Sequence, residues 1–128
     1  MTIETLLKKA KQARENSYAP YSNFHVGCCI LADNNEFYAG TNVENACYPC
    51  GECAESTAIG NMIVAGAKHI KEILVIGSGD TTCFPCGNCR QKISEFATEA
   101  TQVHVVAQDD SVQTYTLAEL LPSQFLLQ

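Results

Sequence analysis

The chain has 128 residues, of which 46% are hydrophobic, and this length and composition fit a single domain over residues 1–128 with one core. The formal net charge is −6, so the surface lacks the positive field that gathers nucleic-acid phosphates, and we expect no nucleic-acid partner. The sequence has no apolar run of about 20 residues and no secretory leader pattern. We therefore expect a soluble, cytoplasmic protein that makes no membrane contact.

The first half of the chain is predicted to form a helix, a hairpin and a second helix. Apolar residues at helical spacing follow Thr2, which can cap a helix that ends near residue 16. Residues 24–32 and 37–43 have the composition of strands, and the short, turn-rich connector between them predicts an antiparallel hairpin. A polar loop then leads into a helix of about fifteen residues, which Gly66 ends.

The second half alternates strands and helices. Residues 73–76 (ILVI) form an unbroken apolar run, typical of a strand that is buried on both faces at the centre of a sheet. Pro85 suits the start of a helix that runs to about residue 98, because the missing N–H of proline would have no helical partner there. Strands are predicted at 103–107 and 112–115, before a short helix with a capping-box pattern that begins at Thr116. This order of elements predicts a three-layer α/β/α fold with a mixed five-stranded sheet.

Two short strings, CAE and PCGNCRQ, carry the chemistry of the sequence. Cys86 and Cys89 lie three residues apart at a predicted helix start, and Cys53 lies near the start of the preceding helix. Helix N-termini favour thiolates, and three thiolates bind zinc with one coordination position open, whereas a structural zinc site closes all four positions with protein. Glu55 can reach the open position if Cys53 lies at the helix edge, and it can then move protons.

Two other interpretations of the cysteines stay open. Cys50 lies three residues before Cys53, so the chain contains two CxxC pairs with Cys86 and Cys89, the general pattern of a closed structural zinc site. The segment between the pairs is longer than in ribbon-like zinc sites, and this favours the open site. Cys83 and Cys86 also match a redox dithiol, although that role would leave Cys53 without a function. The remaining cysteines are expected to be buried or half-buried small residues: Cys28, Cys29 and Cys47.

The two strings occur with three longer segments: residues 18–27 (YAPYSNFHVG), 41–49 (TNVENACYP) and 120–125 (LLPSQF). Together, in this order and nearly from end to end, they resemble the small zinc-dependent cytidine deaminases. The resemblance implies a cytidine deaminase-like fold. It also implies hydrolytic deamination of cytidine and deoxycytidine to uridine and deoxyuridine, with release of ammonia, in pyrimidine salvage.

The resemblance also implies the roles of the two strings. One Zn²⁺ per chain would be held by Cys53, Cys86 and Cys89, and Glu55 would be the catalytic proton shuttle. A zinc-bound hydroxide would attack C4 of the cytosine ring while Glu55 protonates N3 and then the departing ammonia.

The longer segments supply the substrate contacts that the resemblance implies. Asn42 and Glu44 match the positions that bind the ribose hydroxyls, and an amide beside a carboxylate suits a sugar diol. Phe24 matches the aromatic residue that lines the pyrimidine pocket. Tyr48 and Phe125 match residues that complete a neighbouring subunit's site, so the resemblance implies a homotetramer with shared active sites. Two small residues within the matched motifs are further expected substrate contacts: Ala46 and Ala54.

One departure from the family pattern is visible directly after the CAE string. Family members commonly have an arginine there, but this chain has Ser56. Serine supplies no positive charge, so we expect a more electron-rich metal site with slower turnover, unless Arg90 or a lysine compensates. Blasticidin S deaminase resembles the same scaffold and also lacks that arginine, so deamination of a cytosine-nucleoside antibiotic is an alternative function. A non-catalytic zinc module is a further alternative, although it would have no use for Glu55.

Overall fold

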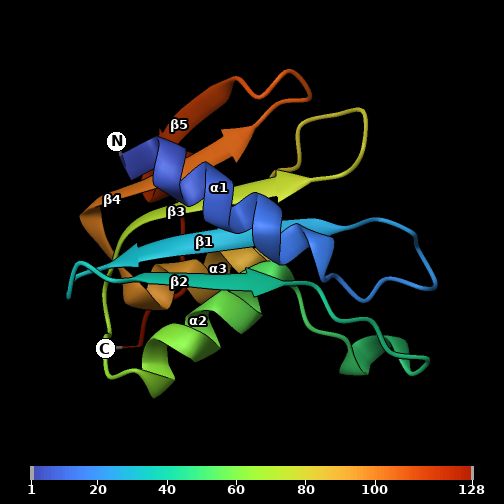
Figure 1. Ribbon diagram of the computed structural model, residues 1–128. Coiled ribbons are helices and arrows are strands. Elements are labelled where there is room, and N and C mark those ends of the chain that lie inside the picture. Colours follow the sequence, from blue (N-terminus) through green and yellow to red (C-terminus); the bar gives the residue numbers. More distant parts are fainter. Residues whose placement is uncertain (1, 128) are drawn as a thin grey trace.

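A mixed five-stranded sheet forms the middle layer of the protein (Figure 1). The computed structural model describes residues 2–127. The strands are β1 (Val26–Ala32), β2 (Phe37–Thr41), β3 (Ile70–Gly77), β4 (Ala97–Val106) and β5 (Val112–Thr116). They lie in the order β2-β1-β3-β4-β5, in which β3 and β4 are parallel and the other neighbouring pairs are antiparallel. The predicted hairpin is therefore confirmed as β1 and β2.

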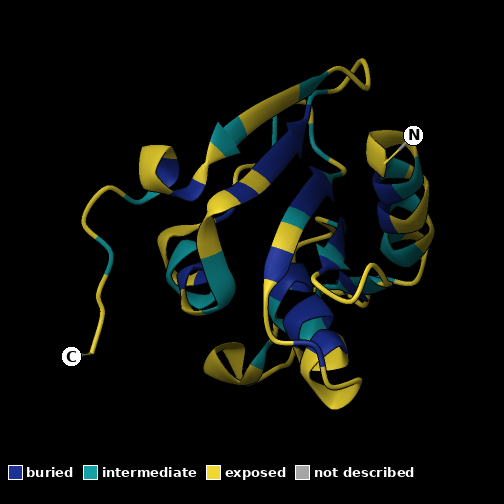
Figure 2. Ribbon diagram, turned by 90° about the vertical axis from the view of Figure 1, so that its left-hand side faces the viewer, coloured by how far each residue is buried: buried dark blue, intermediate teal, exposed yellow. Residues whose placement is uncertain are grey.

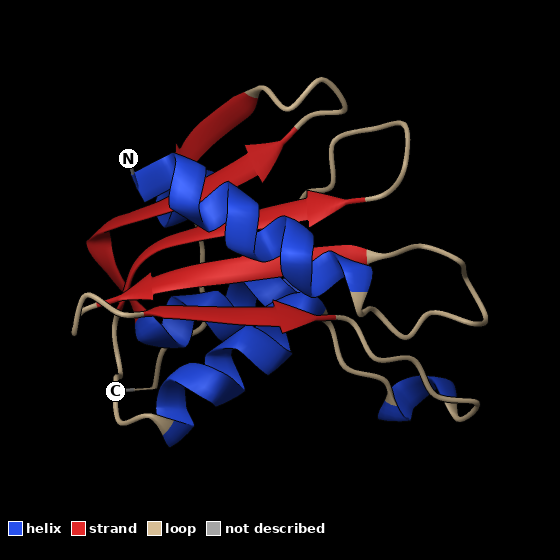
Figure 3. Cartoon of the chain, in the orientation of Figure 1, coloured by secondary structure: helices blue, strands red, loops and turns tan. Residues whose placement is uncertain are grey.

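Helices cover both faces of this sheet, as Figure 3 shows. They are α1 (Thr2–Glu15), α2 (Ala54–Val64), α3 (Gly87–Phe96), α4 (Leu117–Leu120) and the short 3₁₀ helix η1 (Tyr48–Cys50). α1 lies on one face, and α2 and α3 lie on the other, which confirms the predicted three-layer α/β/α fold. Within residues 2–127, no helix has both the length and the apolar character needed to cross a bilayer.

β3 is the central strand, and Figure 2 shows that most of it is buried. Its residues Ile73, Leu74, Val75 and Ile76 are at most 4% exposed, which confirms the prediction made from this apolar run. Alternate side chains point to opposite faces of a strand. Ile73 and Val75 accordingly pack beneath α2 and α3, whereas Leu74 and Ile76 pack beneath α1.

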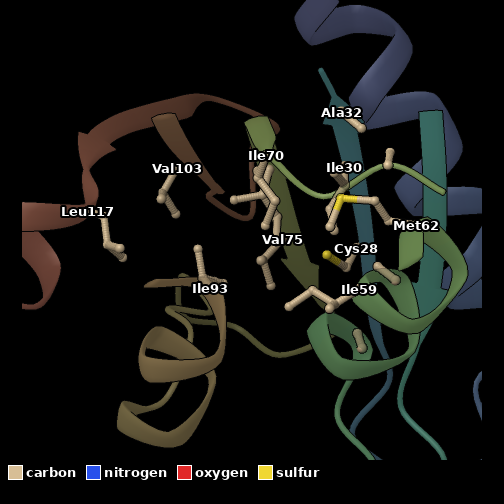
Figure 4. Packing of buried hydrophobic residues seen from close by; sticks show 14 of the residues in the cluster. Cys28, Ile30, Ala32, Ile59, Met62, Ile70, Val75, Ile93, Val103 and Leu117 are labelled. Carbon is tan, nitrogen blue, oxygen red and sulfur yellow. The ribbon is translucent and has the colours of Figure 1, made fainter. Parts of the chain in front are cut away.

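The same alternation separates two adjacent cysteines of β1. Cys28 packs with Met62 in the core beneath α2 and α3 (Figure 4), whereas Cys29 packs with Leu6 beneath α1. Both are fully buried, as predicted. The predicted burial of Cys47 is wrong, because this residue is exposed at the start of η1, in a loop that extends away from the sheet (Figure 1).

The junction of α3 and β4 differs from the prediction. α3 begins after Cys86 rather than at Pro85, and β4 follows the end of α3 without a loop. The first residues of β4 favour a helix by composition, but the Thr101 hydroxyl donates to the carbonyl of Ile70 and accepts from the N–H of Thr98. These contacts with the neighbouring strand and turn override the local helix propensity.

The position of α2 depends on a close approach to β2 at Gly40. A Cβ atom at Gly40 would lie 2.3 Å from the backbone nitrogen of Ala58, so a residue with a side chain does not fit without a shift of α2. Thr57 fixes the same contact, since its hydroxyl accepts from the Thr41 N–H at 2.9 Å and donates to the Thr41 carbonyl at 2.8 Å. At the other end of α2, Gly66 adopts a φ of 94° and ends the helix, as predicted.

We predict that Gly40→Ala destabilises the fold by about 1–3 kcal/mol, because the added methyl group meets helix backbone rather than a flexible side chain. Gly60→Ala is the matched control, since a Cβ at Gly60 within α2 has no atom within 4 Å among the described residues. This control should stabilise the helix by about 0.5–1 kcal/mol. Urea unfolding of both variants measures the difference, and equal stabilities would contradict the role given to the close approach.

Candidate metal and catalytic site

The N-termini of α2 and α3 bring the predicted metal ligands together. Cys53 is the N-cap residue of α2 and Cys86 is the N-cap residue of α3, and both have extended backbone conformations. Cys89 lies in the first turn of α3, and its thiol donates a hydrogen bond to Cys53 Sγ at 2.8 Å. The condition set for Glu55, that Cys53 lies at the edge of its helix, is therefore met.

Glu55 is buried beside these sulfurs. Only 4% of the Glu55 surface is exposed to solvent. A carboxylate oxygen of Glu55 and the sulfurs of Cys53 and Cys89 all lie within 4.8 Å of one another. Cys86 lies outside this tight group and is exposed, but it lines the same cavity as the other two cysteines. The structure thus assembles an acid and two thiols, with the third thiol adjacent.

These contacts shift the pKa values of the three grouped residues. The hydrogen bond from Cys89, with a smaller contribution from the backbone N–H of Ser56, lowers the pKa of Cys53 to about 5. The same hydrogen bond and burial raise the pKa of Cys89, and Cys86 adds to this rise. Burial, followed by the charge of Cys53, raises the pKa of Glu55 to about 7. Cys53 and Cys89 therefore share one proton next to a carboxyl group that ionises near neutral pH.

A cavity of about 650 Å³ opens beside the sulfurs, which is a volume typical of small-molecule sites. Its lining includes four predicted substrate contacts and the three predicted metal ligands: Asn42, Glu44, Ala46, Tyr48, Cys53, Cys86 and Cys89. Residues that the sequence analysis did not identify as contacts also line it, among them Tyr21, Ser22, Asn88 and Lys92. Segments that are distant in sequence therefore meet around one space.

Asn42 is held by the framework around it. Its side-chain oxygen accepts from the Ser17 hydroxyl at 2.6 Å and from the Val26 N–H at 2.9 Å. Its amide nitrogen donates to the Phe24 carbonyl at 2.9 Å. Because an amide nitrogen carries two hydrogens, Asn42 retains a second donor for a ligand in the cavity.

Glu44 is fixed by residues that the sequence analysis missed. The backbone N–H groups of Tyr21 and Ser22 donate to Glu44 Oε1 at 3.0 and 3.1 Å, and the Ser22 hydroxyl donates to Oε2. The Ser22 hydroxyl is the largest cause that lowers the pKa of Glu44, and the backbone donors contribute. The carboxylate is thus ionised and oriented. Both residues lie in the YAPYSNF run, which was the available signal.

Three predicted substrate contacts lie outside the lining of this cavity: Phe24, Ala54 and Phe125. Phe24 precedes β1 rather than beginning it, and its ring lies against Gly77 at the end of β3. Ala54 is fully buried as the first residue of α2. Phe125 is 66% exposed, and its backbone exchanges two hydrogen bonds with the Gln91 side chain of α3, at 2.9 and 3.1 Å.

The alternative four-cysteine zinc site is not assembled among residues 2–127. Cys50 is exposed at the end of η1 and hydrogen-bonds with Cys47, which raises the pKa of Cys50, rather than joining the group around Glu55. Cys83 packs against the hydrophobic core. The four-cysteine structural zinc site is therefore not supported.

Ser56 has a cationic neighbour on α3. Its backbone N–H donates to Cys53 Sγ at 3.4 Å, and its hydroxyl accepts from Lys92 Nζ at 2.6 Å. The sequence analysis allowed for a compensating lysine without identifying it. Lys92 lies three residues after Cys89, on the same side of the helix, and this spacing was the available signal.

The donor set fits a zinc ion. Cysteine sulfurs are preferred ligands of zinc, and two of the three come from the caps of helices whose N-terminal dipoles offset negative charge. Three cysteine ligands would leave one coordination position for a small molecule, and a carboxylate oxygen of Glu55 lies within 4.8 Å of the Cys53 and Cys89 sulfurs. This arrangement suits hydrolytic chemistry better than a purely structural role.

Comparisons with known proteins agree with this geometry. Residues 1–105 match the family model described as "Cytidine and deoxycytidylate deaminase zinc-binding region". A cytidine deaminase of Sporosarcina psychrophila is 37% identical, covering 98% of this chain and 92% of its own. One of Mycoplasma pneumoniae is 41% identical, covering 91% of this chain and 89% of its own. The crystal structure of a Burkholderia pseudomallei cytidine deaminase has a TM-score of 0.91 and 37% identity, covering 98% of this chain and 100% of its own. The chain belongs to the zinc-binding cytidine and deoxycytidylate deaminase family.

Proposed function

We propose that the protein hydrolyses cytidine and deoxycytidine to uridine and deoxyuridine with release of ammonia, as a step of pyrimidine salvage in the cytoplasm. The observation that carries this proposal is the buried Glu55 carboxyl group beside the sulfurs of Cys53 and Cys89, at a cavity of about 650 Å³. A structural zinc site has no use for such an acid. The relatives described above are named cytidine deaminases, and this favours the nucleoside over a blasticidin-type antibiotic.

The residues of the CAE and PCGNCRQ strings have complementary roles in this proposal. Cys53, Cys86 and Cys89 hold one zinc ion per chain. When bound, this ion supplies Lewis-acid activation of water for attack at C4 of the cytosine ring. Glu55 would take one proton from this water and deliver it to ring atom N3. It would then take the remaining proton of the hydroxyl group added at C4 and deliver it to the amino nitrogen, so that C4 becomes a carbonyl and ammonia leaves. Its position between buried helix atoms and the sulfurs excludes bulk water from these transfers.

The substrate sugar is proposed to lie on Asn42 and Glu44. A free amide N–H and an ionised carboxylate are a complementary pair for two neighbouring hydroxyl groups. Both side chains are held by hydrogen bonds to the framework, so little ordering is needed when substrate binds. Ala46 contributes to the same wall of the cavity. Phe24 and Ala54 are retained as proposed pyrimidine contacts.

We further propose a homotetramer in which neighbouring subunits share active sites. Apolar side chains at the C-terminal end are strongly exposed, with Phe125 at 66%, Leu126 at 61% and Leu127 at 90%. Tyr48, on the rim of the cavity, is 90% exposed. Clustered exposed apolar side chains are typical of interfaces. Tyr48 and Phe125 would each contribute to the site of a neighbouring subunit.

Glu55→Gln is expected to lower the rate of deamination strongly while zinc content and fold are retained, because an amide of the same size cannot carry the proton. The rate should fall by about 10²- to 10⁴-fold, the usual contribution of a positioned acid or base. Loss of cytidine absorbance gives the rate, and zinc stoichiometry gives the metal content. Glu95→Gln, at an exposed acid of α3, is the matched control. A Glu55→Gln variant that keeps most of its activity would exclude the proposed proton transfer.

Glu44→Gln should lower kcat/KM for cytidine by about 10- to 100-fold, which corresponds to the loss of a charged hydrogen bond of about 1.5–3 kcal/mol. The loss should be much smaller with 2′,3′-dideoxycytidine, because this substrate lacks both hydroxyl groups. Steady-state rates with the two substrates measure the difference. An equal loss with both would show that Glu44 does not act through the ribose.

Sharing of sites predicts complementation between two impaired variants. Phe125→Ala should weaken assembly and activity, whereas Gln124→Ala at the adjacent residue should not. Mixtures of Glu55→Gln with Phe125→Ala subunits can form some sites in which every contribution is intact. We expect recovered activity after mixing, with assembly mass followed by light scattering. A mixture no more active than the sum of its components would contradict shared sites.

A further inference from the structure

Lys92 is connected to the proposed metal site through a single residue. It lies on α3, is half-buried, and its ammonium donates to the Ser56 hydroxyl at 2.6 Å. The backbone N–H of Ser56 in turn donates to the Cys53 sulfur at 3.4 Å. Lys92 also lines the cavity that contains the sulfurs of the three proposed ligands. Its positive charge therefore lies beside the thiols rather than in bulk solvent.

The surroundings of Lys92 direct this charge towards the thiol group. Within residues 2–127, its ammonium forms no ion pair with a carboxylate within 4.0 Å. Its hydrogen bond to Ser56 instead places the ammonium next to the segment that carries Cys53 and Glu55.

The other candidate cation of α3 is engaged elsewhere. Arg90 Nε donates to the carbonyl of Pro85 at 2.7 Å, and its Nη1 donates to the carbonyl of Leu120 at 2.7 Å. These bonds direct the guanidinium group to the carbonyls that precede α3 and end α4. The sequence offered Arg90 or a lysine as the cation that replaces the missing charge at position 56, and the structure favours the lysine.

We propose that Lys92, held by the Ser56 hydroxyl, is the positioning residue whose charge offsets the negative charge of the ligand thiolates. The inference rests on the proposed function, since it takes Cys53, Cys86 and Cys89 as the zinc ligands. A zinc ion with three thiolates is an anion overall, so a neighbouring cation stabilises it. Lys92 on α3 then supplies the positive charge that Ser56 lacks. The presence of Ser56 therefore no longer predicts an electron-rich metal site with slower turnover.

Zinc retention is the property that this charge should control. Protons compete with zinc for the thiolates. Zinc binds only when the three cysteines are thiolates, and the loaded site then carries a net negative charge. A nearby cation therefore favours the zinc-bound form, and the effect depends on charge rather than on the shape of the lysine side chain. An arginine at position 56 should supply the same charge from the opposite helix.

The test compares zinc affinity by chelator competition at one fixed pH in the zinc-loaded protein. Lys92→Met keeps the aliphatic stem without the charge, and its zinc affinity should fall by about 10- to 100-fold, the usual loss for an outer partner of a metal ligand. Lys92→Arg should retain most of the affinity. The double variant Ser56→Arg with Lys92→Met should recover it. Unfolding temperatures of the zinc-free proteins should be similar, which separates a charge effect from a structural one.

Two results would overturn the inference: an unchanged zinc affinity in Lys92→Met, or a folded double variant that fails to recover it. If Lys92→Met does not fold, Lys92→Gln serves the same comparison. Wild-type protein reports separately on the proposed function. A wild type that binds no zinc and does not deaminate cytidine would overturn both. A wild type with one zinc ion and full turnover, beside an unchanged Lys92→Met, would overturn the inference alone.

Discussion

The meeting of two helix N-termini on one face of the sheet is the constraint on which the site depends. α2 is held against β2 by the close approach at Gly40 and by the Thr57 hydroxyl. α3 is the crossover between the parallel strands β3 and β4, and its packing on the same sheet face fixes its start. Because both helices begin with a cysteine cap, their placement is also the placement of the sulfurs.

This arrangement gathers negative charge where little solvent can screen it. Glu55 is 4% exposed and lies with two sulfurs inside one small group. Helix N-terminal dipoles and backbone N–H groups offset part of this charge, as the Ser56 N–H does for Cys53. A bound zinc ion would neutralise more of it. The burial that makes Glu55 costly to ionise also keeps competing water away from its proton.

The sequence predicted what depends on local pattern. The burial of Cys28 and Cys29 was predicted from their small, apolar character, and the ILVI run identified the central strand. The predictions from sequence were wrong or incomplete where contacts between distant residues determine the structure. The start of β4 is set by the Thr101 hydroxyl, which donates to the carbonyl of Ile70 on the neighbouring strand β3, and no local pattern predicts that bond. The donors that orient Glu44 likewise come from a loop before β1, and the exposure of Cys47 follows from the protruding η1 loop.

The residue after the CAE string illustrates why a motif is best judged together with its surroundings. Considered alone, Ser56 lacks the positive charge that the resemblance implies at this position, and the sequence therefore predicts a deficit of positive charge. At a junction of two helices, however, the same space can be reached from either side. Lys92 approaches from α3, and Ser56 is small enough to leave room for its ammonium and polar enough to hold it. A bulky cation at position 56 would occupy the same space. The positive charge beside the sulfurs can therefore come from a side chain of either α2 or α3.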